Sequence, residues 1–236
     1  MSCDCKLVGR DRIAGLPAGL NPRLFDGLTK PDLNFLLSSA RHRRFHASTL
    51  AIEQEDRAEH CFLLTSGQGR QYVVTPRGKR VLIFWLTAGQ IFGGVSVLSA
   101  PSQYLASTRL VTESCAWMWD RRTIRAFGCR CPQFLDNCLS IAVTEHIAWL
   151  VSTQISLSTK NARGRIAHLL VSLECGVGRV TPDGIELKIS NEDLSAGANV
   201  TPFTVSRTLN DWQRAGALVK GRGRILIKNS FLLASE

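Results

Sequence analysis

The chain has 236 residues, of which 44% are hydrophobic and 20% charged, and its formal net charge is +10. This composition can bury an ordinary core, which excludes an intrinsically disordered chain. The length suits two compact domains, and the basic balance favours polyanionic partners. No uninterrupted apolar run reaches the roughly 18 residues of a membrane span, and Met1–Lys6 lacks the apolar core of a secretory signal. We therefore expect a cytoplasmic protein with no membrane partner.

Residues 1–30 are predicted to be an irregular N-terminal segment, because glycine and proline interrupt every periodic pattern. A short amphipathic helix is expected from Pro31, since proline is favoured in the first turn of a helix. From about Arg43 to Trp119 the pattern changes to short apolar runs separated by turns, which is typical of an all-β barrel or sandwich. The predicted strands are 61–65, 70–74, 80–86, 91–94, 109–112 and 115–119, with turns at 75–78 and 87–90.

After Pro132 no glycine or proline occurs until Gly164, which predicts one long helix over about 131–160. Its predicted apolar stripe comprises Leu135, Leu139, Ala142, His146 and Trp149. A stripe of this length suits a dimer seam resembling a coiled coil. The alternative is a helix packed against its own barrel, and the polar residues beyond position 151 leave that alternative open. A further helix is expected over 161–173, ended by 175–178, with an alternating strand at 185–189.

The segment from Ser190 onward has the pattern of a helix-turn-helix. Ser190 is a suitable helix cap, and Asn199 tolerates the left-handed geometry of a tight turn. A second helix is expected to start with Thr201 as its cap and Pro202 as its first residue, and to end at Gly216. Its buried face is predicted to consist of Val205, Leu209 and Trp212, which are spaced by four and three residues.

The opposite face of this second helix and the hairpin that follows carry the predicted DNA contacts. From Thr201 to Ser230 there are six lysines or arginines against one acid, Asp211. Arginine can bind guanine through two hydrogen bonds, and a basic hairpin tip can lie along phosphates. The hairpin, residues 218–227, is predicted to form the wing that accompanies the helix-turn-helix. The candidate DNA-binding residues are Thr201, Pro202, Phe203, Thr204, Ser206, Arg207, Asn210, Lys220, Arg222 and Arg224.

With these residues in view, the sequence from about 31 to 236 resembles the CRP/FNR family of bacterial transcription regulators. The resemblance rests on Asp193–Ser195 with Val200–Leu209, on Lys160–Ala167, and on the barrel segment Gly67–Gly93. It implies an α+β protein with a cyclic-nucleotide-binding-type jelly roll over 31–130, a dimerisation helix over 131–160 and a winged helix-turn-helix over 161–236. It also implies a homodimer on a near-palindromic operator, with half-sites roughly 34 Å apart. RNA polymerase is a candidate further partner.

The effector is not identified by the sequence. In this family the cyclic-nucleotide cassette carries Gly-Glu followed by an Arg-Ser pair, whereas here Gly94 follows Gly93 and the later window reads Gln103–Ala106. Because an uncompensated phosphate is costly to bury, we expect no response to cAMP. Ser206 and Arg207 match base-contacting residues of FNR-like members. Phe203 replaces a family glutamate, so it can touch a thymine methyl but cannot accept a hydrogen bond from cytosine.

Redox and gas sensing by a bound cofactor remain the alternative function. A thiolate-bound iron–sulfur cluster needs four ligands, and the spacing of the eight cysteines (3, 5, 61, 115, 129, 131, 138 and 175) departs from the family pattern. The interpretation favoured here is that they are ordinary reduced thiols or redox-sensitive ones. Haem ligation could draw on His42, His46, His60, His146 or His168, none of which lies in a recognisable motif. No metal site is predicted, and the cofactor stays unknown.

Two other classes of protein were weighed against a DNA-binding regulator. The sequence contains no nucleophile elbow, phosphate-binding loop, zinc-protease motif or paired carboxylates of an enzyme, so no catalytic residues are predicted. A ligand-binding module without DNA would have no need of a basic wing. The sequence is silent on target genes and on activation versus repression.

Overall fold

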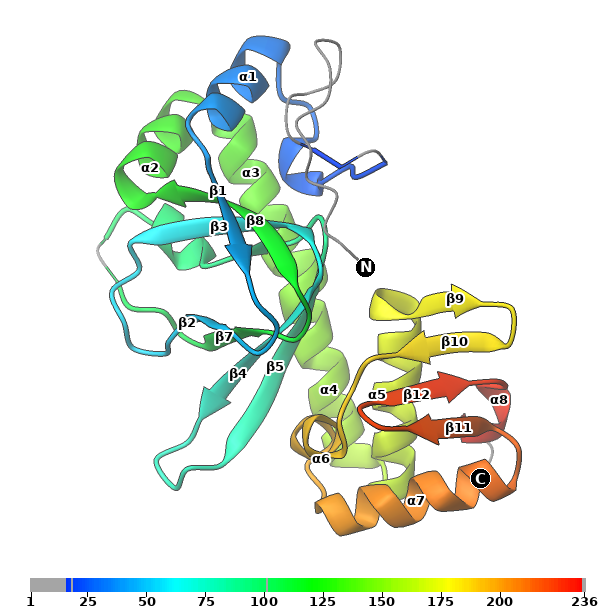
Figure 1. The fold of residues 1–236 in the computed structure, drawn as a ribbon. Coiled ribbons are helices and arrows are strands. Elements are labelled where there is room, and N and C mark those ends of the chain that lie inside the picture. Colours follow the sequence, from blue (N-terminus) through cyan, green and yellow to red (C-terminus); the bar gives the residue numbers. More distant parts are fainter. Residues whose placement is uncertain (1–15, 18, 101, 235–236) are drawn as a thin grey trace. The chain divides into compact units, whose positions relative to one another are not determined.

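The computed structural model describes residues 16–17, 19–100 and 102–234 (Figure 1). The chain divides into two compact units, of which the first takes its residues from 1–73 and 86–148 and the second from 74–85 and 149–236. The predicted fold class is confirmed: a β-barrel, a set of helices and a winged helix-turn-helix follow one another along the chain. Of the irregular segment predicted for 1–30, positions 1–15 and 18 lie outside the described residues, and the described part contains the 3-10 helix η1 (Arg23–Phe25) before an α-helix begins at Lys30.

Two four-stranded sheets form the barrel. The first has the strand order β1 (Arg41–Phe45), β8 (Ser114–Asp120), β3 (His60–Ser66), β6 (Ile91–Phe92), and the second has β2 (Leu50–Ile52), β7 (Ser107–Leu110), β4 (Gln68–Val74), β5 (Arg80–Thr87). The pairing of β3 with β8 is antiparallel and sets Phe62 opposite Met118. The six predicted strands are all present, although 91–94 is a strand only at Ile91–Phe92 and then turns into η2 (Gly94–Val97).

Helices α1 (Lys30–Ser38), α2 (Arg121–Arg130) and α3 (Pro132–Ile141) cover one end of the barrel (Figure 1). Trp119 joins strand and helix, because its ring is fully buried and its Nε1 donates a hydrogen bond to the Leu36 carbonyl at 2.7 Å. Helix α1 carries Pro31 in its first turn, as predicted. Helix α2 was not expected from the sequence. It begins where the Asp120 carboxylate accepts the Thr123 backbone N–H at 2.9 Å, which is an N-cap arrangement.

The long helix after Pro132 consists of α3, a π-helical turn η3 (Ala142–Ile147) and α4 (Ala148–Thr159). Only the first part of the predicted stripe forms one exposed face. Leu135, Leu139 and Ala142 are exposed, whereas His146 and Trp149 are partly buried and the Trp149 ring contacts Phe84 edge to face. The reason is the π turn, which changes the phase of the helix at the middle of the predicted stripe.

The exposed apolar residues of this helix recur every four positions. They are Leu135, Leu139, Val143, Ile147, Val151 and Ile155, with Leu150 beside them. The helix Pro132–Thr159 is long and apolar enough to cross a membrane, judged by length and composition alone. Only 17% of its most apolar stretch of 18 residues is buried. The sequence prediction found no membrane span because it was based on uninterrupted apolar runs, and polar residues interrupt the apolar ones in this helix. Core helices of soluble proteins have the same length and composition, so this property alone does not assign a membrane span.

The second unit contains α5 (Ala162–Val177), α6 (Asn191–Ala198), α7 (Pro202–Arg214) and the short α8 (Phe231–Ala234). Its sheet has the order β11 (Leu218–Gly221), β12 (Arg224–Ile227), β10 (Gly184–Leu187), β9 (Arg179–Thr181). Helix α5 runs through Gly176 to Val177, so the expected break at 175–178 lies only at Gly178. A Cβ at Gly178 would lie 2.5 Å from the Glu174 carbonyl oxygen, which explains why glycine occupies the position that ends the helix.

Candidate DNA-binding surface and sensor domain

The turn between α6 and α7 is built from local hydrogen bonds that the sequence predicts. Ser190 and Asp193 form a capping box, in which the Ser190 hydroxyl accepts the Asp193 N–H at 3.1 Å. Asn199 adopts the left-handed conformation with φ of 50°. Thr201 then caps α7 by accepting the Thr204 N–H at 3.1 Å, and Pro202 occupies the first turn. The predicted helix-turn-helix geometry is therefore present.

Helix α7 buries one face and exposes the other. Val205, Leu209 and Trp212 are between 0 and 1% exposed, as their spacing predicted. Gly216 follows the helix end with φ of 75°. Phe203 is 77% exposed, Arg207 and Asn210 are exposed, and Thr204 and Ser206 are half-buried at the edge of the exposed face. The exposed surface of α7, hereafter the reading face, comprises Thr201, Pro202, Phe203, Thr204, Ser206, Arg207 and Asn210.

Helix α5 fixes the position of α7 through one arginine. The Arg163 guanidinium carbon lies 4.9 Å from the centroid of the Trp212 ring, and its Nη1 lies 4.0 Å from the Asp211 carboxylate. A cation over the face of a tryptophan ring is attracted by the electrons of that face. Arg163 is not among the site residues predicted from the sequence. Its presence in the segment Lys160–Ala167 was the one signal, and no spacing rule connects it to Trp212.

The basic residues of the wing fall into two groups. Lys220 is tied to α7, because its Nζ contacts the Asn210 side chain and its backbone N–H donates to Gln213 Oε1 at 3.0 Å. Arg224 Nη1 lies 3.6 Å from Glu186, which also binds Arg179 at 2.7 Å. In contrast, Arg222 of the wing is exposed and, like Arg207 of α7, has no ion-pair partner among the residues that the structure describes. The sequence analysis missed Gln213 and Glu186, whose roles depend on tertiary contacts.

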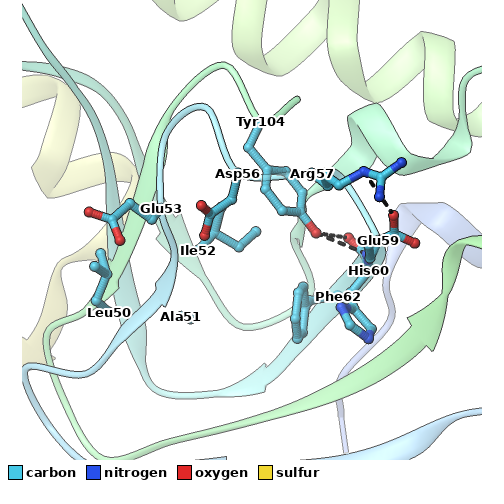
Figure 2. A pocket seen from close by; sticks show the side chains of 10 residues that line it. All are labelled: Leu50, Ala51, Ile52, Glu53, Asp56, Arg57, Glu59, His60, Phe62 and Tyr104. Atoms are coloured by element: carbon cyan, nitrogen blue, oxygen red, sulfur yellow. Dashed lines mark hydrogen bonds and ion pairs between the residues drawn. The ribbon is translucent and has the colours of Figure 1, made fainter. Parts of the chain in front are cut away.

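The barrel of the first unit contains a cavity of about 420 Å³ between β2, β3 and the segment before β7 (Figure 2). Its walls carry three carboxylates and one guanidinium, and Arg57 pairs with Glu59 at 3.9 Å. An excess of carboxylates repels an anion such as a phosphate. The lining residues are Leu50, Ala51, Ile52, Glu53, Asp56, Arg57, Glu59, His60, Phe62 and Tyr104.

Tyr104 closes one side of this cavity. Its hydroxyl accepts the His60 backbone N–H at 2.9 Å and donates to the His60 carbonyl at 2.8 Å, as Figure 2 shows. Burial is the main cause that raises the pKa of Tyr104. Gly93 lies against the same ring with φ of 71°, and a Cβ there would lie 2.6 Å from the His60 carbonyl oxygen. The window Gln103–Ala106, where the family resemblance implies a cation, therefore contributes a neutral phenol to the cavity wall.

Most of the described cysteines are packed into the protein core. Cys61, Cys115 and Cys131 are buried, Cys138 is partly buried, Cys129 is exposed, and all five are free thiols. Burial raises the pKa of Cys61 to about 12 and that of Cys138 as well. A thiol with a raised pKa is a poor metal ligand because the thiolate is the ligand. Cys3 and Cys5 lie outside the described residues, as does the side chain of Cys175.

The five histidines are distributed over separate elements. His42 and His46 are exposed, His60 lines the barrel cavity, and His168 Nε2 lies 3.0 Å from the Ser152 hydroxyl. His146 lies in the π-helical turn, and burial lowers its pKa. Within the described part of the chain, no group of three or more His, Cys, Asp or Glu side chains has an arrangement that could hold a metal ion.

Comparison with known proteins agrees with both halves of this architecture. Residues 42–128 match the model of the cyclic nucleotide-binding domain, and residues 164–235 match that of the Crp-like helix-turn-helix domain. The chain is 25% identical to the cyclic AMP receptor protein of Thermus thermophilus, over 89% of this chain and 94% of the relative.

Solved structures give the same fold at lower identity. FixK2 from Bradyrhizobium japonicum superposes with a TM-score of 0.71 at 18% identity, covering 82% of this chain and 95% of that one. The regulator CLP of Xanthomonas campestris, described as responsive to c-di-GMP, superposes with a TM-score of 0.74 at 14% identity, covering 85% and 100%. A barrel of the cyclic-nucleotide-binding type followed by a winged helix-turn-helix defines a DNA-binding transcription regulator. The chain belongs to the CRP/FNR family.

The two groups of wing residues lead to different expected effects on DNA binding. Replacing Arg222 by alanine removes a free charge and should reduce the slope of log affinity against log salt by about 1. Arg224→Ala should reduce this slope by less than half as much, because Arg224 already forms an ion pair with Glu186 in the free protein. Fluorescence anisotropy of duplex DNA between about 50 and 200 mM salt measures both slopes. Equal losses in the two variants would contradict the division.

Proposed function

We propose that this protein is a cytoplasmic, non-enzymatic transcription regulator that binds a near-palindromic operator as a homodimer and is switched by an effector other than cAMP. The observation that carries the proposal is the reading face of α7. Its apolar side is buried, and Arg207 projects from its exposed side without a partner among the described residues. An α-helix presenting such residues fits the major groove of B-DNA, where arginine discriminates guanine.

The homodimer is supported by the exposed apolar residues of the long helix. The side chains of Leu139, Val143 and Ile147 are 63, 46 and 50% exposed. Burying them against a second copy of the chain would remove this apolar surface from water. A repeat of four residues drifts by about 40° per step in an α-helix. The wider π-helical turn η3 opposes this drift locally. The membrane-span alternative has no other support, because the Crp-like and cyclic-nucleotide-binding matches flank this helix.

The absence of a cAMP response is supported by the composition of the barrel cavity. Its carboxylates outnumber its cations, and the single guanidinium, Arg57, is paired with Glu59. Gly94 has no side chain to hold a ribose hydroxyl, and the Tyr104 hydroxyl is already bonded to His60. Binding a phosphate there would require burying a negative charge beside other negative charges.

Removing the reading arginine should weaken and relax DNA recognition. We expect Arg207→Ala to cost about 1–3 kcal/mol of operator binding and to broaden the base preference at one position. Phe203→Glu should change the preference at the neighbouring position, because glutamate accepts a hydrogen bond from cytosine and phenylalanine cannot. Binding selection from random duplexes followed by anisotropy measures both effects. Lys188→Gln, an exposed cation outside the reading face, is the matched control. Unchanged specificity in Arg207→Ala would show that α7 is not the reading helix.

A charge placed on the exposed apolar residues of the long helix should separate the subunits. Val143→Glu introduces a carboxylate that must be desolvated when two copies associate, so we expect a monomer with weakened operator affinity. Sedimentation velocity of the purified variant measures the oligomeric state. Val180→Glu is the control, because Val180 is 82% exposed on β9 and is not part of the long helix. A dimeric Val143→Glu protein would place the dimer interface elsewhere.

The cavity chemistry predicts that cAMP does not bind. Isothermal titration of the purified protein with cAMP should give no saturable heat for dissociation constants tighter than about 1 mM, and cAMP should leave the melting temperature unchanged. A tight, saturable isotherm would contradict the prediction and would leave the DNA-binding assignment untouched.

A further inference from the structure

A second cavity lies within the DNA-binding unit, at the junction of α4 and α5. Its volume is about 540 Å³, which is in the range of pockets that hold small organic ligands. The lining begins at Thr159, the last residue of α4, and continues along α5 to Val171. Leu233 of α8 closes the far side. The complete lining is Thr159, Lys160, Asn161, Gly164, Ala167, His168, Val171 and Leu233.

The floor of this junction cavity is apolar. Ala167 is 5% exposed and Leu233 is 1% exposed, and Val171 lies one turn beyond Ala167 on α5. A hydrocarbon or aromatic group placed on this floor leaves water without displacing any internal hydrogen bond. The floor therefore selects a ligand with an apolar body.

The rim carries two basic side chains and no acid. Lys160 has no hydrogen-bond or ion-pair partner for its ammonium group among the described residues, and no aspartate or glutamate lines the cavity. His168 faces the same space while its Nε2 is held by the Ser152 hydroxyl at 3.0 Å. Burial, and after it the positive charge of Lys160, lowers the pKa of His168. Two basic groups that disfavour each other's charge are both stabilised by an anion placed between them.

The polar residues near the rim are already satisfied by the fold. The Asn161 side chain caps α5 by accepting the Gly164 N–H at 2.8 Å. Gly164 itself contributes only backbone to the lining, next to the side chains of Asn161 and Lys160. The cavity thus combines an apolar floor, a free ammonium group and a histidine, and none of these features is used by the reading face or the wing.

We propose that the junction cavity is a binding site for a small amphipathic anion, with an apolar body on Ala167, Val171 and Leu233 and a carboxylate or sulfonate held by Lys160 and His168. The site is distinct from the barrel cavity, whose carboxylates favour the opposite charge. It adjoins Arg163, the residue that holds Trp212 and Asp211 of α7. An occupant at Gly164 therefore contacts the same turn of α5 that positions the reading helix.

The full-length protein can be titrated with 8-anilinonaphthalene-1-sulfonate, an aromatic sulfonate that fluoresces when it enters an apolar site. We expect saturable binding with one probe per chain, displaced by octanoate and not by octylamine, since only the former supplies an anion. Val171→Phe fills the floor and should abolish this binding. Lys160→Gln should weaken it about tenfold, and His168→Gln should weaken it while keeping the hydrogen bond to Ser152. Lys188→Gln, an equally exposed lysine outside the cavity, should leave the isotherm unchanged.

Each outcome of these titrations either supports or overturns the proposed anion site. Circular dichroism checks that Val171→Phe folds, and Lys160→Gln, an exposed substitution, tests the anion site even where Val171→Phe does not fold. Binding that is insensitive to Lys160→Gln, or displaced equally by octylamine, would overturn the proposal, as would the absence of saturable binding. The titration contains no DNA, so its failure and a failure of the proposed DNA binding are separate results.

Discussion

The ring of Trp212 is fully buried against the rest of the DNA-binding unit, with the Arg163 guanidinium 4.9 Å from its centroid, and this burial constrains which side of α7 faces outward. A helix has one rotational setting in which Val205, Leu209 and Trp212 are all buried. In that setting Arg207 and Phe203 project from the exposed side. The specificity of the reading face therefore depends on packing beneath it, since base edges must be met within a few tenths of an ångström for paired hydrogen bonds to form.

The helix-turn-helix was the part of the structure that the sequence predicted best, because its determinants are local. Ser190, Asn199, Thr201 and Gly216 each act within four residues of their own position, through caps or a left-handed turn. Six of the barrel strands were likewise predicted from short-range patterns, whereas the jelly-roll fold class followed from the family resemblance and the order of the strands in the two sheets was not predicted. The division of the wing into free and paired charges could not be predicted, because Glu186 and Arg224 are far apart in the sequence and meet only through the pairing of β10 with β12.

The stripe of the long helix was predicted only in its first part, for a related reason. A period of 3.6 residues assumes unbroken α-helix, and the π turn at Ala142–Ile147 breaks that assumption without any proline or glycine to mark it. Glu145 in this turn bonds to Arg23 at 3.1 Å and to Gln90 at 2.9 Å, so partners distant in the sequence surround it. Helix α2 was missed because its start depends on the Asp120 cap, which follows the predicted strand 115–119 directly, with no turn residue between strand and helix.

The protein has a net charge of +10, but some of the cations near the reading face are already paired within the protein. Lys220 and Arg224 are engaged with Asn210 and Glu186, whereas Arg207 and Arg222 remain free. Free charges attract a polyanion from a distance, while paired ones must first exchange partners, which costs part of the Coulomb energy gained. We therefore expect Arg222 at the wing tip to contribute to the capture of DNA and Arg207 to base discrimination. The contact between Lys220 and Asn210 joins the wing to the reading face in the free protein, so we expect DNA bound at either residue to compete with this contact.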